Sequence, residues 1–427
     1  MGVTLIVSFL LLLVFGVPIA LSIGFSALIV HVLSDMPLEA MPQTLFSGVS
    51  SFSLVAVPFF VLAGDILAQG GISDRIVAFA EATLGRIRGG LSIVSIVASM
   101  FIAAISGSGA ATTAAVGSAL LPQLKKKGYD LDFSAALIAA SGTIGVIIPP
   151  SVPMVLYAVI SGVPVSKLFM AGFIPGFLMG GILIAYALYI ARKRGYPASE
   201  PVSGRVKFGL FLNALWGLMT PVLILGGIFS GYFTPSEAAA VAVVYSFFVA
   251  VFIYKAMDAK KVYRLVVNAG VTSSLIMFII ATSKFFGWQL AFYEIPDKIA
   301  SAMLSATGGV PFMVYLVIIV IILIAGMFME TASALIILTP IFLPAILSLG
   351  GNLIHFGMIV TVGLAIGMAT PPVAIDIYVA SAITGLSLEQ ISRPIIPMII
   401  ALILVFLLVT YIPQISLFLP ALVYGSL

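Results

Sequence analysis

The stretch SGTIGVIIPPSVPMVLYA, residues 141–158, places two glycines and three prolines inside a long apolar run. Proline lacks a backbone N–H, and its ring keeps the carbonyl four residues earlier from bonding within a helix. In the hydrocarbon core each unpaired backbone group costs several kcal/mol, so a break persists only where protein or a cavity satisfies the freed groups. We therefore expect a transmembrane helix that is interrupted part-way, at a functional position.

The composition of the whole chain fits a membrane protein. Of its 427 residues, 62% are hydrophobic and only 8% are charged, whereas soluble domains have about 45–50% apolar and about 25% charged residues. The first thirty residues lack the basic start of a cleaved signal peptide, and their apolar run is long enough to span a bilayer. The absence of cysteine excludes disulfides and thiolate metal sites. Basic residues occur in short clusters without interleaved aromatics, which argues against nucleic acid as a partner.

Two basic clusters predict a re-entrant hairpin over residues 89–121. Arg86 and Arg88 precede this apolar run, and Lys125–Lys127 follow it. Loops rich in Lys and Arg face the cytoplasm, so a single span would put one cluster on the wrong side. A hairpin that enters and leaves on the same face keeps both clusters inside, with its turn at SGSGA, 106–110. One long tilted helix is the alternative.

The sequence also matches itself after a shift of 222 residues, from about 106–175 onto 328–397. The shift places Leu121-Pro122 on Leu343-Pro344, Ile144-Gly145 on Ile366-Gly367, Pro149-Pro150 on Pro371-Pro372, and Pro175 on Pro397. Apolar matches arise by chance in such a chain, but aligned prolines and glycines are much less expected. We infer an internal repeat.

The two copies are expected to have opposite orientations. Basic clusters flank the first copy, whereas the second has no Lys or Arg from 299 to 392, so its hairpin would open from the outside with a turn near 326–333. Inverted repeats with interrupted helices near the midplane are typical of secondary transporters. We divide the chain into N-terminal scaffold helices (1–70), a first transport repeat (71–191; hairpin 89–121, broken helix 132–162), central scaffold helices (192–293) and a second transport repeat (294–427; hairpin 310–349, broken helix 353–383).

The breaks offer ligands for both a cation and an anion. The paired elements are GTIGVIIPP (142–150) and AIGMATPP (365–372). Freed carbonyls can ligate a small cation, and half-helix N-termini can hold a carboxylate. The hairpin turns would add hydroxyls: Ser106 and Ser108 beside Gly145, and Thr331 and Thr370 beside Gly367. The alternative is that each Pro-Pro is a kink and each glycine a close-packing point.

Several polar residues stand out in apolar surroundings. Acids inside a membrane are functional candidates by default, and Glu330 and Asp376 are the best placed. Asp65 lies nearer a membrane end, where we expect a structural role. Lys284 could oppose a carboxylate or extend to the interface. We expect His355 at the interface, and Trp216 and Trp288 in the aromatic belt.

Five segments of this sequence resemble the large membrane subunit of tripartite ATP-independent periplasmic (TRAP) transporters. They are SGSGAATTAAVGSALLPQLKKKGYD, GTIGVIIPPSVPMVLYA, AGFIPG, GIFSGYFTPSEAAAVAVVY and GMATPPVAIDIYVAS, and the resemblance runs from VPIALSIG to TYIPQISLFLP. It implies an all-α polytopic membrane protein: an inverted-repeat, elevator-type transporter with two re-entrant hairpins and two broken transmembrane helices.

The resemblance also implies function, partners and sites. The family imports organic acids, such as C4-dicarboxylates and sialic acids, across the bacterial inner membrane, driven by a gradient of Na⁺, with two or more ions expected. Its partners are a separate small membrane subunit of about four helices and a periplasmic substrate-binding protein. Carried over onto this sequence, the Na⁺ sites fall on Ser106, Gly145 and Pro149 and on Gly326, Gly367 and Thr370. The substrate-binding residues fall on Ser108, Pro149, Pro150, Thr331, Pro371, Pro372 and Asp376.

Three other functions compete with this interpretation. A stand-alone carrier of organic anions would show the same hydropathy and repeat without needing a binding protein. An intramembrane serine hydrolase is suggested by Gly107-Ser108-Gly109, but His355 is the one intramembrane base available and nothing else organises a triad. A channel is the third, although paired breaks in inverted repeats suit alternating access better.

Overall fold

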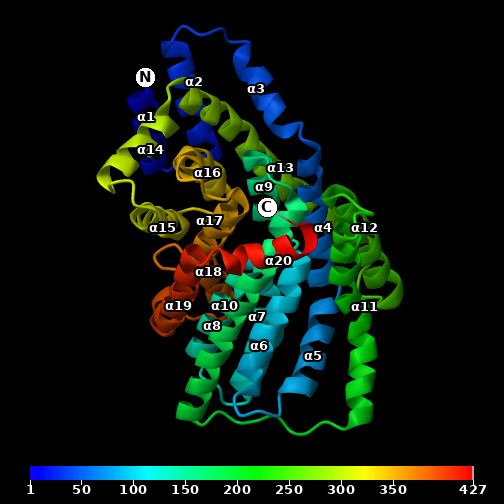
Figure 1. Ribbon diagram of the computed structural model, residues 1–427. Coiled ribbons are helices and arrows are strands. Elements are labelled where there is room, and N and C mark those ends of the chain that lie inside the picture. The colour runs from blue at the N-terminus through cyan, green and yellow to red at the C-terminus, as the bar shows by residue number, and fades with distance from the viewer. Residues whose placement is uncertain (426–427) are drawn as a thin grey trace.

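The computed structural model describes residues 1–425, and over that range the chain is helical without a strand (Figure 1). By length and apolar composition, eight helical segments in this range could cross a membrane. The α-helices are α1 (Gly2–Val14), α2 (Ile19–Leu33), α3 (Ala40–Val49), α4 (Ala56–Gln69), α5 (Ile72–Leu84), α6 (Gly90–Ser106), α7 (Gly109–Lys126), α8 (Leu131–Gly142), α9 (Val152–Ser161), α10 (Val165–Arg194), α11 (Gly204–Phe229), α12 (Pro235–Phe248), α13 (Ala259–Phe292), α14 (Ile295–Ala306), α15 (Pro311–Phe328), α16 (Thr331–Ser348), α17 (Leu353–Gly367), α18 (Ile375–Thr384), α19 (Leu388–Tyr411) and α20 (Gln414–Tyr424). Two short 3₁₀ helices are η1 (Phe52–Val55) and η2 (Thr143–Val146), and η3 (Val249–Ile253) is a short π-helix.

The two interruptions predicted from the prolines are present. Helix α8 ends at Gly142, tightens into η2, and resumes as α9 only after an irregular link at 147–151. Helix α17 ends at Gly367 and resumes as α18 after the link 368–374. Both Pro-Pro peptide bonds lie in these links and are cis. The two broken helices therefore occupy matching places in the two repeats.

Each repeat also contains a pair of helices joined by a two-residue turn. Helices α6 and α7 are separated by Gly107 and Ser108, and α15 and α16 by Met329 and Glu330. Residues 89–121 are thus not the single long helix that was the alternative. Gly107 has a φ of +61°, a left-handed conformation that favours glycine, so the residue type suits the turn.

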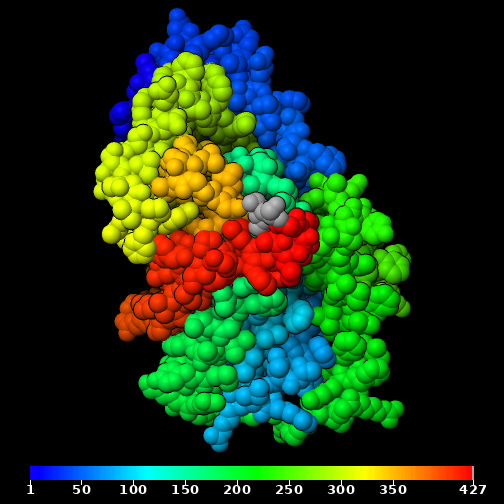
Figure 2. Space-filling view, in the orientation of Figure 1, coloured from blue at the N-terminus to red at the C-terminus, as the bar shows by residue number. Residues whose placement is uncertain are grey.

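The two repeats interlock. Helix α7 packs against α8 of its own repeat and against α18 of the other, and α16 packs against α17 and against α9. Each helix pair therefore contacts the first half of its own broken helix and the second half of the other one. In Figure 1, α5–α8 lie in the lower half of the molecule, beside α10 and α11, and α14–α16 lie at the upper left, while Figure 2 shows the C-terminal helices crossing the front between them.

The N-terminal run differs from the sequence expectation. Instead of one spanning segment, residues 2–33 form the two short helices α1 and α2. Gly16 has a φ of +77°, and Pro18 stands at the start of α2. A left-handed glycine followed by a residue without an N–H ends one helix and begins another, which explains the break.

Helix α12 begins with a capping box. The Thr234 side chain accepts from the N–H of Glu237 at 3.3 Å, and Glu237 Oε2 accepts from the N–H of Thr234 at 2.8 Å. Two otherwise unpaired helix donors are satisfied in this way.

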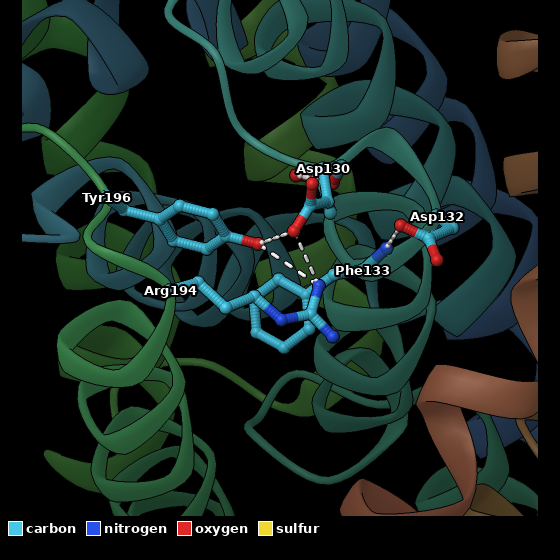
Figure 3. A network of polar contacts seen from close by, with 6 residues as sticks. Asp130, Asp132, Phe133, Arg194 and Tyr196 are labelled. Carbon is cyan, nitrogen blue, oxygen red and sulfur yellow. Dashed lines mark hydrogen bonds and ion pairs between the residues drawn. The ribbon is translucent and has the colours of Figure 1, made fainter.

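The basic end of the first repeat is held by a polar network around Asp130 (Figure 3). Asp130 Oδ2 accepts hydrogen bonds from the Tyr196 hydroxyl at 2.7 Å and from Arg194 at 2.6 Å. Tyr129 donates to the carbonyl of Pro197 at 2.9 Å, and Lys127 pairs with Glu81 at 2.6 Å. The connection between α10 and α11 is thereby fastened to the turn between α7 and α8.

The charge of Asp130 stabilises this end of the fold. The hydrogen bond from Tyr196, together with the Arg194 hydrogen bond and charge, lowers the pKa of Asp130 below its ordinary value. A carboxyl group whose pKa is lowered by folding stabilises the fold above its unfolded pKa, and that stabilisation is lost as the pH falls through the folded pKa. The network therefore contributes most near neutral pH.

We predict that Asp130→Asn lowers the stability of the purified protein at pH 7 by less than about 1 kcal/mol, because both ionic side chains are well exposed. The difference from wild type should shrink as the pH falls below about 4 and through the lowered folded pKa, where the wild-type carboxyl group takes up a proton. Thermal melts across pH measure this. Asp132→Asn is the control, since Asp132 accepts only from the N–H of Phe133, at 2.7 Å. Equal destabilisation at all pH values would contradict the prediction.

Candidate functional site

A cavity of about 460 Å³ lies where the two hairpin turns approach one another. Its walls come from both repeats and from α4 and α13 outside them, so it is the place where the repeats meet the rest of the chain. Its lining residues are Ile19, Val61, Gly64, Asp65, Ser106, Gly107, Ser108, Ala111, Val146, Val152, Pro153, Thr272, Leu275, Ile276, Ile279, Glu330, Ala332, Ser333 and Met368. This volume suits a small organic ligand, whose pockets measure about 300–1,000 Å³.

The first hairpin turn carries a compact group of hydroxyls. Ser106 Oγ lies 2.9 Å from Thr112 Oγ1 and 3.2 Å from the carbonyl of Ser108, and Thr112 Oγ1 donates to that same carbonyl at 2.8 Å. Ser108 caps α7 by accepting from the N–H of Ala111 at 3.5 Å. The turn thus gathers three hydroxyls and a carbonyl, which are suitable oxygen ligands for a hard cation.

The first turn touches the first break because a glycine permits it. A Cβ on Gly145 would lie 2.6 Å from the carbonyl oxygen of Ser108 and 2.7 Å from Thr112 Oγ1. Such distances are sterically forbidden, so any larger residue would push the turn away. The predicted neighbours Ser106 and Gly145 are therefore brought together through Ser108 and Thr112.

The second hairpin also lies close to its break, but two glycines make the contact and an acid caps the helix that follows the turn. A Cβ on Gly367 would overlap the Cα of Gly326 and lie 2.8 Å from its carbonyl oxygen. Thr370 Oγ1 donates to the carbonyl of Ile366 at 2.7 Å. Glu330, in the turn, caps α16: its Oε2 accepts from the N–H groups of Ala332 at 2.9 Å and Ser333 at 3.2 Å.

The helix N-termini around the cavity are electrostatically unequal. Helices α7 and α9 begin with the neutral caps Ser108 and Ser151 and have no acid in their first turns. Helix α16 begins with Glu330, and α18 has Asp376 in its first turn. Helix N-termini attract anions unless an acid already occupies them. The N-termini of the first repeat are therefore the ones free to receive an anion.

The acidic side chains lining the cavity are Asp65 and Glu330, and within residues 1–425 no Lys, Arg or His lines it. A second cavity of about 610 Å³, between α3, α9, α13 and α16, has Lys284 in its wall. Lys284 therefore opposes neither acid across the first cavity.

Sequence comparison settles the family. Residues 6–415 match the family model described as the DctM component of the tripartite ATP-independent periplasmic transporter. The chain belongs to this family. As a DctM-component permease it is a multi-pass membrane transport protein and not an enzyme.

Curated relatives of this permease carry different substrate names. It is 42% identical over 93% of its length to a C4-dicarboxylate large permease, DctM, of Pseudomonas aeruginosa, of which it covers 93%. It is 34% identical to the sialic acid large permease SiaM of Vibrio cholerae, with 97% of each chain covered. An isethionate permease, DctMQ, of Oleidesulfovibrio alaskensis is 41% identical over 96% of this chain, which spans only 65% of that longer relative.

Solved structures share the fold at low identity. The Alcanivorax borkumensis YdaH transporter superposes with a TM-score of 0.62 at 13% identity, covering 89% of this chain and 90% of that one. Neisseria gonorrhoeae MtrF, from a class of antimetabolite efflux pumps, gives 0.57 at 13% identity, covering 90% and 85%. The permease therefore has the fold of these membrane transporters.

The structure separates the predicted substrate residues into two groups. Ser108 lines the cavity, as does Ser106 of the predicted first Na⁺ site, whereas Pro149, Pro150, Thr331, Pro371, Pro372 and Asp376 do not. Thr331 and Asp376 are fully buried instead. Their neighbours Glu330, Ala332 and Ser333 form the wall at the second turn. A ligand in this cavity would thus touch the second repeat through Glu330 and Ser333, while Asp376 lies behind the wall.

Sequence reasoning missed three polar residues of the cavity: Asp65 of α4, Thr272 of α13 and Ser333 of α16. Asp65 was expected to be structural because it lies near the end of an apolar run. The one signal available was an acid within that run; which way it faces depends on helix packing. His355, expected at the interface, is buried, and its Nε2 lies 3.1 Å from the carbonyl of Thr410. It does not line the cavity beside Ser108, so this geometry offers no hydrolase site there.

Proposed function

We propose that this permease is a Na⁺-coupled importer of an organic acid across the bacterial inner membrane. It receives its substrate from a periplasmic binding protein and works with a small membrane subunit of about four helices. The two repeats form a transport unit that moves by an elevator-type mechanism against the scaffold helices. The family match and the substrate names of the relatives support the transport of organic anions.

One observation carries the proposal: two interrupted helices and two hairpin turns, one of each from either repeat, converge on the same cavity. Carbonyls and hydroxyls of the first turn and break, at Ser106 and Gly145, would hold one Na⁺. Those of the second, at Gly326, Gly367 and Thr370, would hold another. Na⁺ binding on both sides of the cavity would order the turns that a substrate must touch, which would couple the two binding events.

The charges around the cavity favour a monoanion with hydroxyl groups. Its acid group would lie at the free N-termini of α7 and α9, near Ser108 and Val152, where unpaired N–H groups attract negative charge. Its other end would face Glu330, which accepts hydrogen bonds and repels a second negative charge. Sialic acid and isethionate, the substrates named for two relatives, are hydroxylated monoanions. A C4-dicarboxylate, named for other relatives, would be doubly charged.

We predict that Ser106→Ala and Thr370→Val each raise the Na⁺ concentration needed for half-maximal uptake by about tenfold, because each removes one oxygen ligand. Uptake of sialic acid, isethionate and succinate into proteoliposomes at a series of Na⁺ concentrations measures this. Ser118→Ala is the control, since Ser118 only bonds to the carbonyl of Ala115 within α7. Both variants keeping wild-type Na⁺ activation would refute the assignment of the two sites.

The partners are tested by the same uptake assay with and without the cognate periplasmic protein. Strict dependence on that protein, and copurification of a small subunit, support the tripartite system. Uptake by the isolated permease alone would instead identify a stand-alone carrier of the same architecture.

A further inference from the structure

Asp376 is a buried acid that does not line the cavity. It stands in the first turn of α18, its side chain is fully buried, and its N–H donates to the carbonyl of Met368 at 3.1 Å. Within the described residues 1–425, neither carboxylate oxygen has a hydrogen-bond partner. An ionised carboxylate in such a place is strongly unfavourable unless a charge or several donors compensate it.

Oxygen atoms from the first repeat lie close to Asp376. A Cβ on Gly109 of α7 would lie 3.3 Å from Asp376 Oδ2 and 3.2 Å from the carbonyl oxygen of Gly142. A Cβ on Gly142 would collide with Thr113 Oγ1 and lie 3.2 Å from the carbonyl oxygen of Gly109. Four oxygen atoms thus gather around the close contact of these two glycines.

Thr113 strengthens this inference because its hydroxyl is also without a partner among the residues that the structure describes. Thr113 is fully buried and projects from α7 toward the α8 side of the same contact. Two unpartnered polar side chains from different repeats therefore meet in one place. Buried oxygens that converge on an acid, with no basic side chain to balance its charge, are typical of a cation site.

No basic side chain can serve as the counter-charge. On α7 the nearest is Lys125, roughly 18 Å along the helix from Thr113 at 1.5 Å per residue. Helix α8 has an acid, Asp132, at its far end, and α18 has no other charged side chain. On α19, Arg393 pairs with Glu389 at 2.6 Å and is exposed. The charge must therefore be met by a bound ion or by a proton.

We propose that Asp376 is the charged ligand of a further Na⁺ site, which Asp376 and Thr113 form between the two repeats with the backbone oxygens of Gly109 and Gly142. One carboxylate neutralises one monovalent cation. Residues 1–425 hold no group of three or more His, Asp or Glu side chains that would suit a multivalent metal. The site is additional to those at Ser106 and Thr370, and the inference rests on the proposed Na⁺ coupling.

The consequence would be a link between the repeats. Helices α7 and α18 come from different repeats and pack against one another. An ion held by both would fix α18, and with it the second Pro-Pro link, against the first hairpin. Na⁺ binding would then favour one arrangement of the two breaks.

The test is a count of bound ions on the purified, full-length protein. Saturation binding of radioactive ²²Na⁺ should show one ion fewer per chain in Asp376→Asn than in wild type. Asparagine keeps the shape, and its N–H₂ group can donate to the surrounding oxygens, so folding should persist. Asp74→Asn is the matched control, because Asp74 is an exposed acid in the first turn of α5; it should bind as many ions as wild type.

A second pair of variants, at Thr113, tests the same site without changing Asp376, in case Asp376→Asn does not fold. Thr113→Val should raise the Na⁺ concentration for half-saturation by about tenfold, whereas Thr113→Ser should bind like wild type. An unchanged ion count in a folded Asp376→Asn protein would overturn the inference and mean that Asp376 simply holds a proton. If wild type itself bound no Na⁺, the proposed Na⁺ coupling would fail together with this site.

Discussion

Gly367→Ala is expected to abolish Na⁺-dependent uptake, because the new methyl group would occupy the position of the Gly326 backbone. Backbone atoms cannot rotate away as a flexible side chain can, so α15 and α17 would have to separate. Overpacking of this kind costs about 1–3 kcal/mol of stability and shifts the backbone. A shift of even about 1 Å would pull Gly326 and Thr370 apart and spoil a site whose ligands must lie within fixed distances of an ion.

Uptake in proteoliposomes and a thermal melt separate the two effects. We expect a protein that still folds but neither transports nor gains stability from Na⁺. Gly181→Ala is the control: this helical glycine of α10 has nothing within 4 Å of the position of a Cβ. Wild-type uptake by Gly367→Ala would show that the close approach of the second hairpin to its break is dispensable.

The interruptions and the repeat could be predicted from sequence because proline pairs and glycines mark them. A proline pair removes helix hydrogen bonds in any surroundings. The helices are accordingly interrupted at Pro149-Pro150, in the link 147–151, and at Pro371-Pro372, in the link 368–374. The first turn was predicted from the basic clusters on either side of 89–121 and the small residues at 106–110, and the second turn was placed through the internal repeat.

The direction in which each acid faces could not be predicted in this way. Asp65 faces the cavity and Asp376 is buried behind its wall, although both lie in apolar segments. The difference arises from packing between helices far apart in sequence: α18 lies on α7, whose Gly109 admits the carboxylate of Asp376. Thr113 had no sequence signal of its own, since a threonine in an Ala- and Thr-rich helix is ordinary until its neighbours are known.

The two repeats therefore have the same backbone arrangement but differ in the acidic residues at their helix starts. Ser108 and Ser151 start the half-helices of the first repeat, whereas Glu330 and Asp376 stand at the corresponding starts of the second. Neutral caps in both repeats would give two equivalent positions for an anion. In the proposed binding mode the acids make the second set of helix starts repel anions, so a substrate would have one orientation in the cavity.

Glu330→Gln tests that asymmetry directly, and we expect it to improve the binding of a dianion relative to a monoanion. Two negative charges about 7 Å apart at an effective dielectric constant of about 20 repel by about 2 kcal/mol, or about thirtyfold in affinity. Glutamine retains an oxygen that can accept from Ala332 and Ser333, so the cost to α16 should stay within about 0.3–1 kcal/mol.

The measurement is competition of succinate against isethionate for uptake at neutral pH. In Glu330→Gln the ratio should move toward succinate by about tenfold or more, whereas Asp297→Asn, which removes an exposed acid from the first turn of α14, should leave it unchanged. Asp297→Asn is a suitable control because both variants lose one carboxylate at a helix start. The carboxylate of Glu330 lines the cavity, and that of Asp297 does not. An unchanged ratio in Glu330→Gln would mean that the second charge of a substrate never approaches the second hairpin turn, and the proposed orientation would have to be reversed.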